Sequence, residues 1–334
     1  MVMAATPSVP RLQISVIVSN YNYGRFLAET IASVLSQLGP EDEIIVVDDG
    51  STDESREILK SLAGASRLRI ILQRNSGSLD ALANGLTLAR NEIVTFLDAD
   101  DWYLEGHLER VRTLFEEHRE IDFAFARGRI HAAPGSDPRA SAAILRRMEY
   151  PPGPVGSNAL VAALASDWVG SPTSGLALRR PLARAIFERV GVPAPGLAMF
   201  PDAVLVRGAD LLGARKYALA EAGFGYRIHG ANHHRSLREP FERWRQRRNR
   251  TRSIRNRCLQ SSAPDSDPPS ASALADEAKL RAWPCSGRAR IQLALIYVLL
   301  AVRRCRGSFR QRVELAIAAA RRAVRNGPAR VQDP

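Results

Sequence analysis

The sequence predicts an α/β fold in which helices flank a doubly wound, mostly parallel sheet. Three observations support this. Short runs of β-branched apolar residues recur, segments with helical apolar spacing separate them, and polar residues follow where several runs end. Strands that alternate with helices are typical of parallel sheets covered on both faces. We therefore expect ligands to bind beyond the carboxyl ends of the strands.

The expected elements of the first half follow one another in a regular order. Strands are expected at 12–19, 43–47, 68–72 and 93–97. Helices are expected at 26–38, 53–62, 79–89 and 104–119. A Ser-Thr-Asp capping signal precedes the second helix, and the strands are β-branched apolar runs of the kind that parallel sheets bury.

The second half is less regular. A further strand is expected at 121–125, and the stretch 132–156, rich in Pro, Gly and Ser, predicts a loop or insertion. The apolar spacing predicts helices at 176–190 and 202–212, whereas 217–228 has an extended pattern.

Composition excludes several classes of protein. A chain of 334 residues with 45% hydrophobic and 25% charged residues is neither disordered, nor collagenous, nor a small disulfide-stapled domain. Three cysteines, Cys258, Cys285 and Cys305, match no compact metal-ligand spacing and indicate a reducing compartment. No secretory signal opens the chain, and its longest apolar stretch, 291–302, is shorter than the roughly 20 residues that span a bilayer. We therefore expect a cytoplasmic protein without a transmembrane helix.

Positive charge concentrates near the end of the chain. The net charge is +12, but residues 241–334 carry 21 Lys or Arg and 7 Asp or Glu, so this segment has a charge of +14 and the rest −2. It is expected to be a basic helical region with a Ser-, Pro- and Asp-rich linker near 261–272. Such charge favours an anionic surface as a partner. The alternative is that the positive charge reflects a bias of composition without a binding function, because 44 of the 47 basic residues are Arg, as a G- and C-rich genome would impose.

Carboxylates cluster after two of the expected strands. Asp98, Asp100 and Asp101 follow one strand, and Asp48 and Asp49 follow another. Carboxylate oxygens suit Mg²⁺ or Mn²⁺, which complete their coordination with water and substrate phosphates. A carboxylate also accepts hydrogen bonds from ribose hydroxyls in dinucleotide-binding folds. The alternative is that the Asp98–Asp101 cluster is a polar turn that caps the following helix.

The segments ISVIVSNYNYGRFL, IIVVDDGSTDES and NEIVTFLDADD together resemble the family 2 glycosyltransferases of the GT-A fold. The joint occurrence of DDGSTD and DADD, about 50 residues apart, is far more specific than either motif alone. The resemblance covers residues 12–120 well and continues more loosely to about 236. It departs from the family pattern at Ser19, because the first strand of the family commonly ends in a proline.

The resemblance implies one GT-A domain at 12–240, with a nucleotide-binding half at 12–125 and an acceptor half at 126–240. Residues 1–11 are then a disordered N-terminus. The residues expected to contact the nucleotide sugar are Ser19, Tyr21, Asp49, Arg74 and Asp98, of which Arg74 is the weaker candidate. Asp98 and Asp100 form the D-x-D motif of the family, which implies a divalent metal, Mn²⁺ or Mg²⁺. Asp100 is the expected direct ligand, and Asp98 lies near the ribose or the waters of the metal.

An inverting glycosyltransferase needs a general base near the acceptor hydroxyl. The resemblance implies an Asp at the start of a helix in the second half, which here is Asp202, unless that residue only caps the helix. Asp210 and then Asp167 are the next candidates. The segment YRIHGAN resembles the YRxHGxN of many relatives, so His229 is expected to reach the metal or the diphosphate, unless it is a structural hydrogen-bonder. Residues 171–175 are expected to be a turn that shapes the acceptor pocket, or a plain loop.

The expected function is therefore transfer of a single sugar, with inversion, from a UDP-linked donor to a glycan or lipid-linked acceptor. The alternative is a catalytically inactive nucleotide-sugar-binding or scaffold protein of the same fold. Nucleic-acid binding through the basic segment 243–257 is disfavoured because it matches no recognised module, and a nicotinamide-dependent dehydrogenase because G-x-G-x-x-G is absent. Peripheral contact of the basic region with the cytoplasmic membrane face is a hypothesis. Flotation with anionic vesicles tests it, since a chain ending at residue 240 would then bind less.

Overall fold

The structure, a computed structural model, describes residues 11–132, 150–156, 169–190 and 200–229, together with Glu314 and Ile317. The expectations for residues 1–10, Asp167, the three cysteines, the linker near 261–272 and nearly all of the basic region fall outside these ranges.

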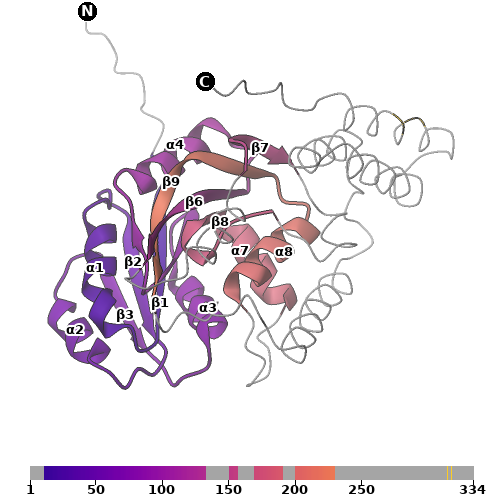
Figure 1. The fold of residues 1–334 in the computed structure, drawn as a ribbon. Coiled ribbons are helices and arrows are strands. Elements are labelled where there is room, and N and C mark those ends of the chain that lie inside the picture. The colour runs from indigo at the N-terminus through magenta and orange to yellow at the C-terminus, as the bar shows by residue number, and fades with distance from the viewer. Residues whose placement is uncertain are drawn as a thin grey trace, which may run out of the picture.

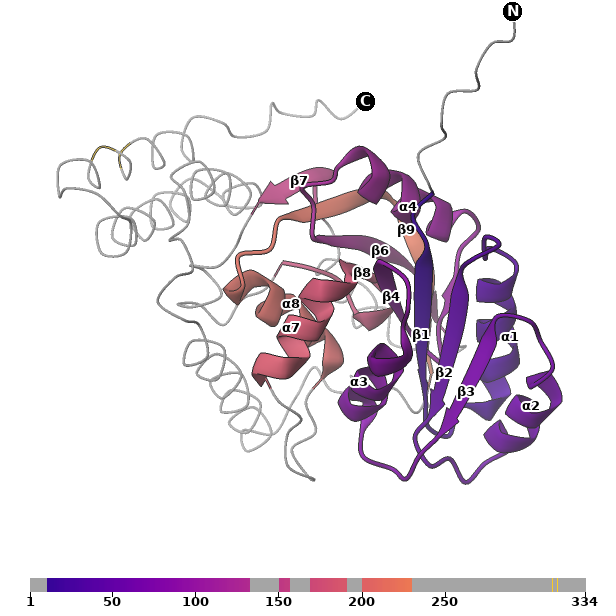
Figure 2. The ribbon, with the colours of Figure 1, turned by 180° about the vertical axis from the view of Figure 1, so that it is seen from behind.

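The first half of the chain alternates between strands and helices, as the sequence predicts. The strands are β1 (Ile14–Asn20), β2 (Glu43–Asp48), β3 (Leu68–Leu72) and β4 (Ile93–Asp98). The helices are α1 (Gly24–Leu35), α2 (Ser55–Leu62) and α3 (Ser78–Leu88). The four strands are parallel and lie in the order β3-β2-β1-β4, so their carboxyl ends meet at one edge of the sheet. Helices α1 and α2 cover one face of this part of the sheet and α3 covers the other (Figures 1 and 2).

The second half adds strands of both directions to the same sheet. It begins with β5 (Trp102–Tyr103) and α4 (His107–Glu117) and continues with β6 (Phe123–Ala132) and β7 (Gly153–Gly156). A 3₁₀ turn (Thr173–Gly175) then precedes β8 (Leu176–Arg179), α7 (Arg180–Val190), α8 (Pro201–Leu211) and β9 (Lys216–Ile228). In the described ranges the sheet has nine strands, in the order β3-β2-β1-β4-β8-β6-β9-β5, and β7 pairs with β9. The predicted α/β class with a mostly parallel sheet and flanking helices is confirmed.

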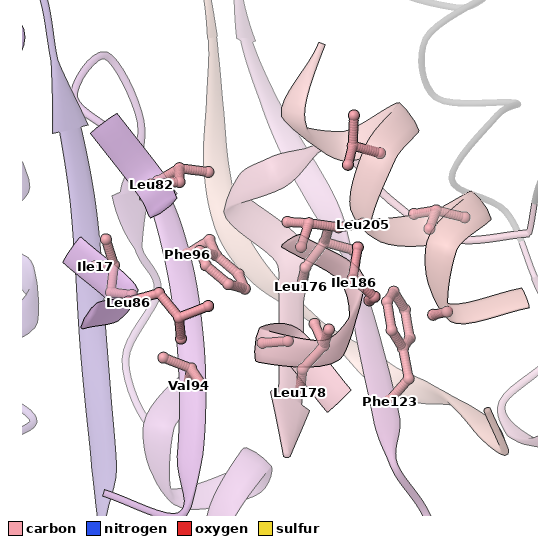
Figure 3. Close-up of a cluster of buried hydrophobic side chains, with 14 of the residues drawn as sticks. Ile17, Leu82, Leu86, Val94, Phe96, Phe123, Leu176, Leu178, Ile186 and Leu205 are labelled. Carbon is pink, nitrogen blue, oxygen red and sulfur yellow. The ribbon is translucent and has the colours of Figure 1, made fainter. Parts of the chain in front are cut away.

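The core explains why the first strands are continuous apolar runs. Every residue of β1 and of β2 is buried, since helices pack on both faces of the sheet. Successive side chains point to opposite faces. Ile17 therefore packs with Leu82 and Leu86 of α3 in the cluster shown in Figure 3, whereas its neighbours Val16 and Val18 belong to the cluster on the α1 face.

Two sequence-based expectations need correction. A single helix was expected at 176–190, but residues 176–179 form strand β8, and the helix begins at Arg180. The reason is tertiary, because β8 fills the gap between β4 and β6, where Ala177 pairs with both Thr95 and Ala124. In the expected loop at 132–156, the described residues 153–156 form β7.

None of the helices in the described part of the chain is both long and apolar enough to cross a membrane.

Candidate active site

The acids after β4 lie where β1 and β4 end side by side. Ser19 of β1 pairs in register with Asp98 of β4, and the Ser19 hydroxyl donates to Asp98 Oδ1 over 3.4 Å. Asp100 and Asp101 follow in a tight turn and are 8% and 2% exposed. The continuous apolar sequence of β4 places the end of the strand, and the turn after it carries the carboxylates.

Asp101 holds this turn from two directions. Its Oδ2 accepts a hydrogen bond of 2.6 Å from the hydroxyl of Ser174, and its Oδ1 accepts one of 3.0 Å from the backbone N–H of Arg227. The Ser174 oxygen in turn accepts the backbone N–H of Asp98 at 3.2 Å. The 3₁₀ turn, expected at the acceptor pocket or in a plain loop, thus lies against the acids after β4. Both of its oxygens accept hydrogen bonds, so Asp101 fixes the shape of the turn.

Burial and, after it, mutual repulsion both disfavour the charged forms of these acids. Burial raises the pKa of Asp98 to about 8, and the negative charges of Asp100 and Asp202 act in the same direction. Burial, together with the charges of Asp100 and Asp98, raises the pKa of Asp101 well above its ordinary value. A cation at this turn would relieve that repulsion.

Asp202 approaches the same acids from the second half of the chain. It lies in the first turn of α8, directly after Pro201, and its Oδ1 accepts the backbone N–H of Ala203 at 2.7 Å. Pro is favoured at this first helical position because its fixed φ suits a helix start. The charge of Asp202 also contributes to the raised pKa of Tyr226, after burial and the three acids that follow β4. The carboxylate of Asp202 is therefore near the turn after β4.

Asp210 has a different environment from Asp202, although both are on α8. Its side chain is fully buried and forms an ion pair of 2.6 Å with Lys216 Nζ. The same ammonium donates to the carbonyl oxygens of Val169 and Val206 at 3.0 and 3.1 Å. Asp210 thus belongs to the core and is closed to an acceptor.

His229 faces Asp100 at the end of β9. Its Nε2 is 3.1 Å from Asp100 Oδ2, and its Nδ1 is 3.4 Å from Arg25 Nη2. A guanidinium only donates, so Nδ1 is the acceptor and the proton of the neutral ring is on Nε2, directed at Asp100. The ring also packs against Phe26, with centroids 5.0 Å apart. The structure thus places His229 beside the D-x-D motif, and its contact with the metal or the diphosphate stays a prediction.

The acids after β2 form a neighbouring group. Asp49 Oδ1 accepts from the Gln73 side chain and from the Ser76 backbone, each at 2.8 Å, and Oδ2 accepts from the Gly77 backbone at 2.8 Å. Asp48 is fully buried and accepts from Asn20 and Ser51. Three of the roughly four lone-pair positions of Asp49 are therefore used to shape the turn before α3.

Two further predicted residues lie around this group. Arg74 lines an open pocket of about 450 Å³, whose other lining residues are Gly50, Arg56, Leu72, Gln73 and Asn75. Tyr21 follows β1 and is 45% exposed. The fold thus brings together Ser19, Asp98, Asp100, Asp202 and His229, and it gathers Asp49 and Arg74 beside them at the ends of β2 and β3. The ligand roles of all these residues stay predictions.

The donor set suits a hard divalent cation that is completed by substrate. In the described ranges no three His, Cys, Asp or Glu side chains form a ready metal cage. Mg²⁺ and Mn²⁺ commonly use one or two carboxylates and take the remaining ligands from water and phosphate. Asp98 and Asp100 supply such carboxylates, and His229 lies beside Asp100. The residues therefore fit a cation bound together with a diphosphate.

Sequence reasoning missed three residues that shape this site. Ser174 links Asp98 to Asp101, Arg25 contacts His229, and Glu29 pairs with Arg227. Arg25 lies within the family-like segment NYNYGRFL, so its position was a usable signal. Ser174 lies in the segment 171–175 that was expected to be a turn, but the sequence does not indicate its partners Asp98 and Asp101. Glu29 carries no local signal, because its partner lies far away along the chain.

Comparisons with known proteins identify relatives of this chain. Residues 15–171 match the family described as Glycosyl transferase family 2. An uncharacterized glycosyltransferase of Nostoc sp. is 34% identical over 230 residues, which are 67% of this chain and 67% of the relative. The glycosyltransferase GlyG of Streptococcus pneumoniae is 39% identical over 111 residues, which are 33% of this chain and 36% of GlyG.

Solved structures show the same fold. The match to the structure of S. aureus TarS 1–349 in complex with UDP-GlcNAc covers 93% of this chain and 90% of the TarS 1–349 chain, with a TM-score of 0.53 and 17% identity. The complex of TarS 1–349 with UDP gives a TM-score of 0.55, also at 17% identity, and the match covers 94% of this chain and 89% of the TarS 1–349 chain. With its GT-A type sheet and its identity to the Nostoc relative over two thirds of both chains, this chain belongs to glycosyl transferase family 2 and is a glycosyltransferase.

Proposed function

We propose that the chain is an inverting, metal-dependent glycosyltransferase that moves one sugar from a UDP-linked donor to a hydroxyl of a glycan or lipid-linked acceptor. One observation carries the proposal. Asp202 from α8 and the D-x-D acids from β4 are close enough for Asp202 to raise the pKa of Asp98. The proposed base and the proposed leaving-group site thus interact electrostatically, which supports the proximity that single displacement requires. The binding of UDP-GlcNAc and UDP by TarS, which has the same fold, supports the choice of nucleotide.

Asp202 is the proposed general base. As the acceptor oxygen forms a bond to the anomeric carbon, its proton passes to the Asp202 carboxylate. The bond between that carbon and the diphosphate oxygen breaks, and the electron pair stays on the phosphate. Attack from the face opposite the diphosphate inverts the anomeric centre. The hydrogen bond from Ala203 N–H to Asp202 Oδ1 helps to hold this carboxylate at the start of α8.

The donor diphosphate is proposed to bind at Asp98 and Asp100. A divalent cation held there would supply Lewis-acid stabilisation of the negative charge that develops on the diphosphate. Asp100 is the proposed direct ligand, with His229 beside it. Asp49 is proposed to contact the base or the ribose, and Ser19 and Tyr21 to border the base. Arg74 is proposed to contact the base or the diphosphate.

Thermal unfolding with UDP, GDP or dTDP, each with Mn²⁺ or with EDTA, tests the donor site. A ligand at 100 times its dissociation constant adds about 2.7 kcal/mol to the free energy of unfolding. We expect stabilisation by UDP with Mn²⁺ that EDTA abolishes and that Asp100→Ala loses. Glu117→Ala, which removes an exposed carboxylate of α4, is the control and should keep it. Folded protein that responds to none of the nucleotides would contradict the proposal.

Turnover separates the enzyme from an inactive binding protein of the same fold. The protein is incubated with Mn²⁺, a panel of UDP-sugars and candidate acceptors, and NMR reads the anomeric configuration of the product. We expect the configuration opposite to that of the donor. Retained configuration would overturn the proposal of single displacement by Asp202.

A further inference from the structure

The side chain of Arg227 joins three separate parts of the chain. Its Nε donates to the carbonyl oxygen of Asp100 at 2.9 Å, and its Nη2 forms an ion pair of 2.9 Å with Glu29 Oε2 on α1. The guanidinium carbon lies 4.5 Å from the ring centroids of both Phe26 and Trp102. The charged group is thus held between two aromatic rings, with hydrogen-bond partners on α1 and in the turn after β4.

These contacts bear directly on the D-x-D turn. The backbone N–H of Arg227 donates to Asp101, while its side chain donates to the peptide carbonyl of Asp100. Two residues further along, His229 Nε2 meets Asp100 Oδ2. Any rotation of the turn relative to the end of β9 would therefore disturb the Arg227 contacts and the His229–Asp100 contact together.

We propose that Glu29 and Arg227, stacked between Phe26 and Trp102, form a clamp that positions Asp100 and His229 to receive the metal–diphosphate group of the donor. Both are positioning residues, since they act through Asp100 and His229. The proposal rests on the proposed function and adds to it the two residues that orient the donor site.

Energetic considerations indicate that Glu29 and Arg227 order the turn after β4 and contribute little to the stability of the whole protein. The side chain of Glu29 is 56% exposed, and ion pairs of that kind contribute little to the stability of the whole protein. The guanidinium of Arg227 contributes a specific geometry, because its planar group stacks on aromatic rings and donates hydrogen bonds along fixed directions, which an ammonium does not do. Neutralising Glu29 should therefore loosen the turn without unfolding the protein, and Arg227→Lys should do so despite keeping the charge.

The chain offers a matched control in Arg179 and Glu92. Arg179 also pairs with a glutamate, donates to backbone carbonyls and stacks on an aromatic ring, Phe115, at 5.3 Å. Glu92 is 53% exposed, close to the value for Glu29. The Arg179–Glu92 pair lies next to the start of β4, at the opposite end of that strand from the D-x-D turn. Glu92→Gln therefore removes an equivalent ion pair away from the site.

The test compares the full-length wild type with Glu29→Gln, Arg227→Lys and Glu92→Gln. Thermal stabilisation by UDP gives the half-saturating Mn²⁺ concentration of each protein. Hydrogen exchange of peptides that cover residues 98–103 is followed in metal-free protein. We expect the half-saturating Mn²⁺ concentration to rise about threefold in Glu29→Gln and about tenfold in Arg227→Lys. Exchange at 98–103 should be faster in both, and Glu92→Gln should match the wild type.

Three results would overturn the clamp. The first is that Glu29→Gln and Glu92→Gln behave alike, and the second is that Arg227→Lys equals the wild type. Faster exchange with an unchanged requirement for Mn²⁺ would mean that the contacts only support the fold. A wild type that shows no Mn²⁺-dependent response to UDP is a distinct outcome, because it contradicts the proposed function itself.

Discussion

Single residues take their roles from burial and partners more than from their type. Asp202 and Asp210 are both aspartates of α8, separated by two helical turns. One is partly exposed beside the acids after β4, and the other is buried against Lys216. Sequence alone left both open as the base. The structure removes Asp210, because a carboxylate that neutralises a buried ammonium cannot also collect a proton from an acceptor.

Replacement of Asp202 by Asn tests the base. Asp202→Asn keeps an oxygen that can accept the backbone N–H of Ala203, so α8 should start as before. It removes the basic carboxylate, and kcat should fall by about 10²- to 10⁴-fold.

Two measurements check this prediction. Steady-state kinetics give kcat, and a thermal shift with UDP and Mn²⁺ should match the wild type, because the D-x-D acids remain. If kcat stays within a few-fold of the wild type, Asp202 is not the base, and Asp167, outside the described residues, becomes the next candidate.

Local sequence patterns predict the strands and helices of the first half, but they do not explain why α3 contains a glycine. Gly85 lies in the middle of α3, where glycine lowers helix stability by about 1 kcal/mol relative to alanine. Packing explains its presence. A Cβ at this position would lie 2.4 Å from Ile17 Cγ2 and 3.3 Å from Val47 Cγ2. The helix can thus pack this closely on β1 and β2 only because the position has no side chain.

We therefore expect Gly85→Ala to destabilise the protein in spite of its better helix propensity. Overpacking of a full core costs about 1–3 kcal/mol of the free energy of unfolding. Urea denaturation measures the loss. Ile17→Ala should suppress part of it, so that the double variant is more stable than the two single losses predict. A stabilised Gly85→Ala would show that the α3 interface is looser than described.

At the scale of the whole molecule, a buried ion pair between Lys216 and Asp210 connects strand β9 of the sheet to helix α8. Lys216 begins β9, and its ammonium contacts Asp210 and the carbonyl of Val206, both on α8, and the carbonyl of Val169. It also lies 4.6 Å from the ring centroid of Phe123 on β6. The pair therefore links the helix that carries Asp202 to the sheet and to the segment that leads into Ser174.

Removing one partner should be costly. Lys216→Met leaves the Asp210 carboxylate without this cation in the core, which should lower the free energy of unfolding by about 3–5 kcal/mol. Lys216→Met combined with Asp210→Leu should recover most of the loss, because no charge then stays buried. Chemical denaturation of the four proteins of this cycle measures the coupling. A loss below about 1 kcal/mol in Lys216→Met would mean that water reaches the pair.

The sequence by itself determined the fold class, the strands and helices up to α4 except the two-residue strand β5, and the D-x-D and DDGSTD segments at strand ends. It could do so because the spacing of apolar residues, the helix capping signals and the polar residues that follow strands are local properties, each visible within about a dozen residues. Only the tertiary structure decided that residues 176–179 form a strand, that Asp101 is held by Ser174 and Arg227, and that Asp210 is buried while Asp202 is not. Each of these depends on partners far apart along the chain, and local patterning carries no information about which distant side chain will fill a gap, accept a proton or neutralise a charge.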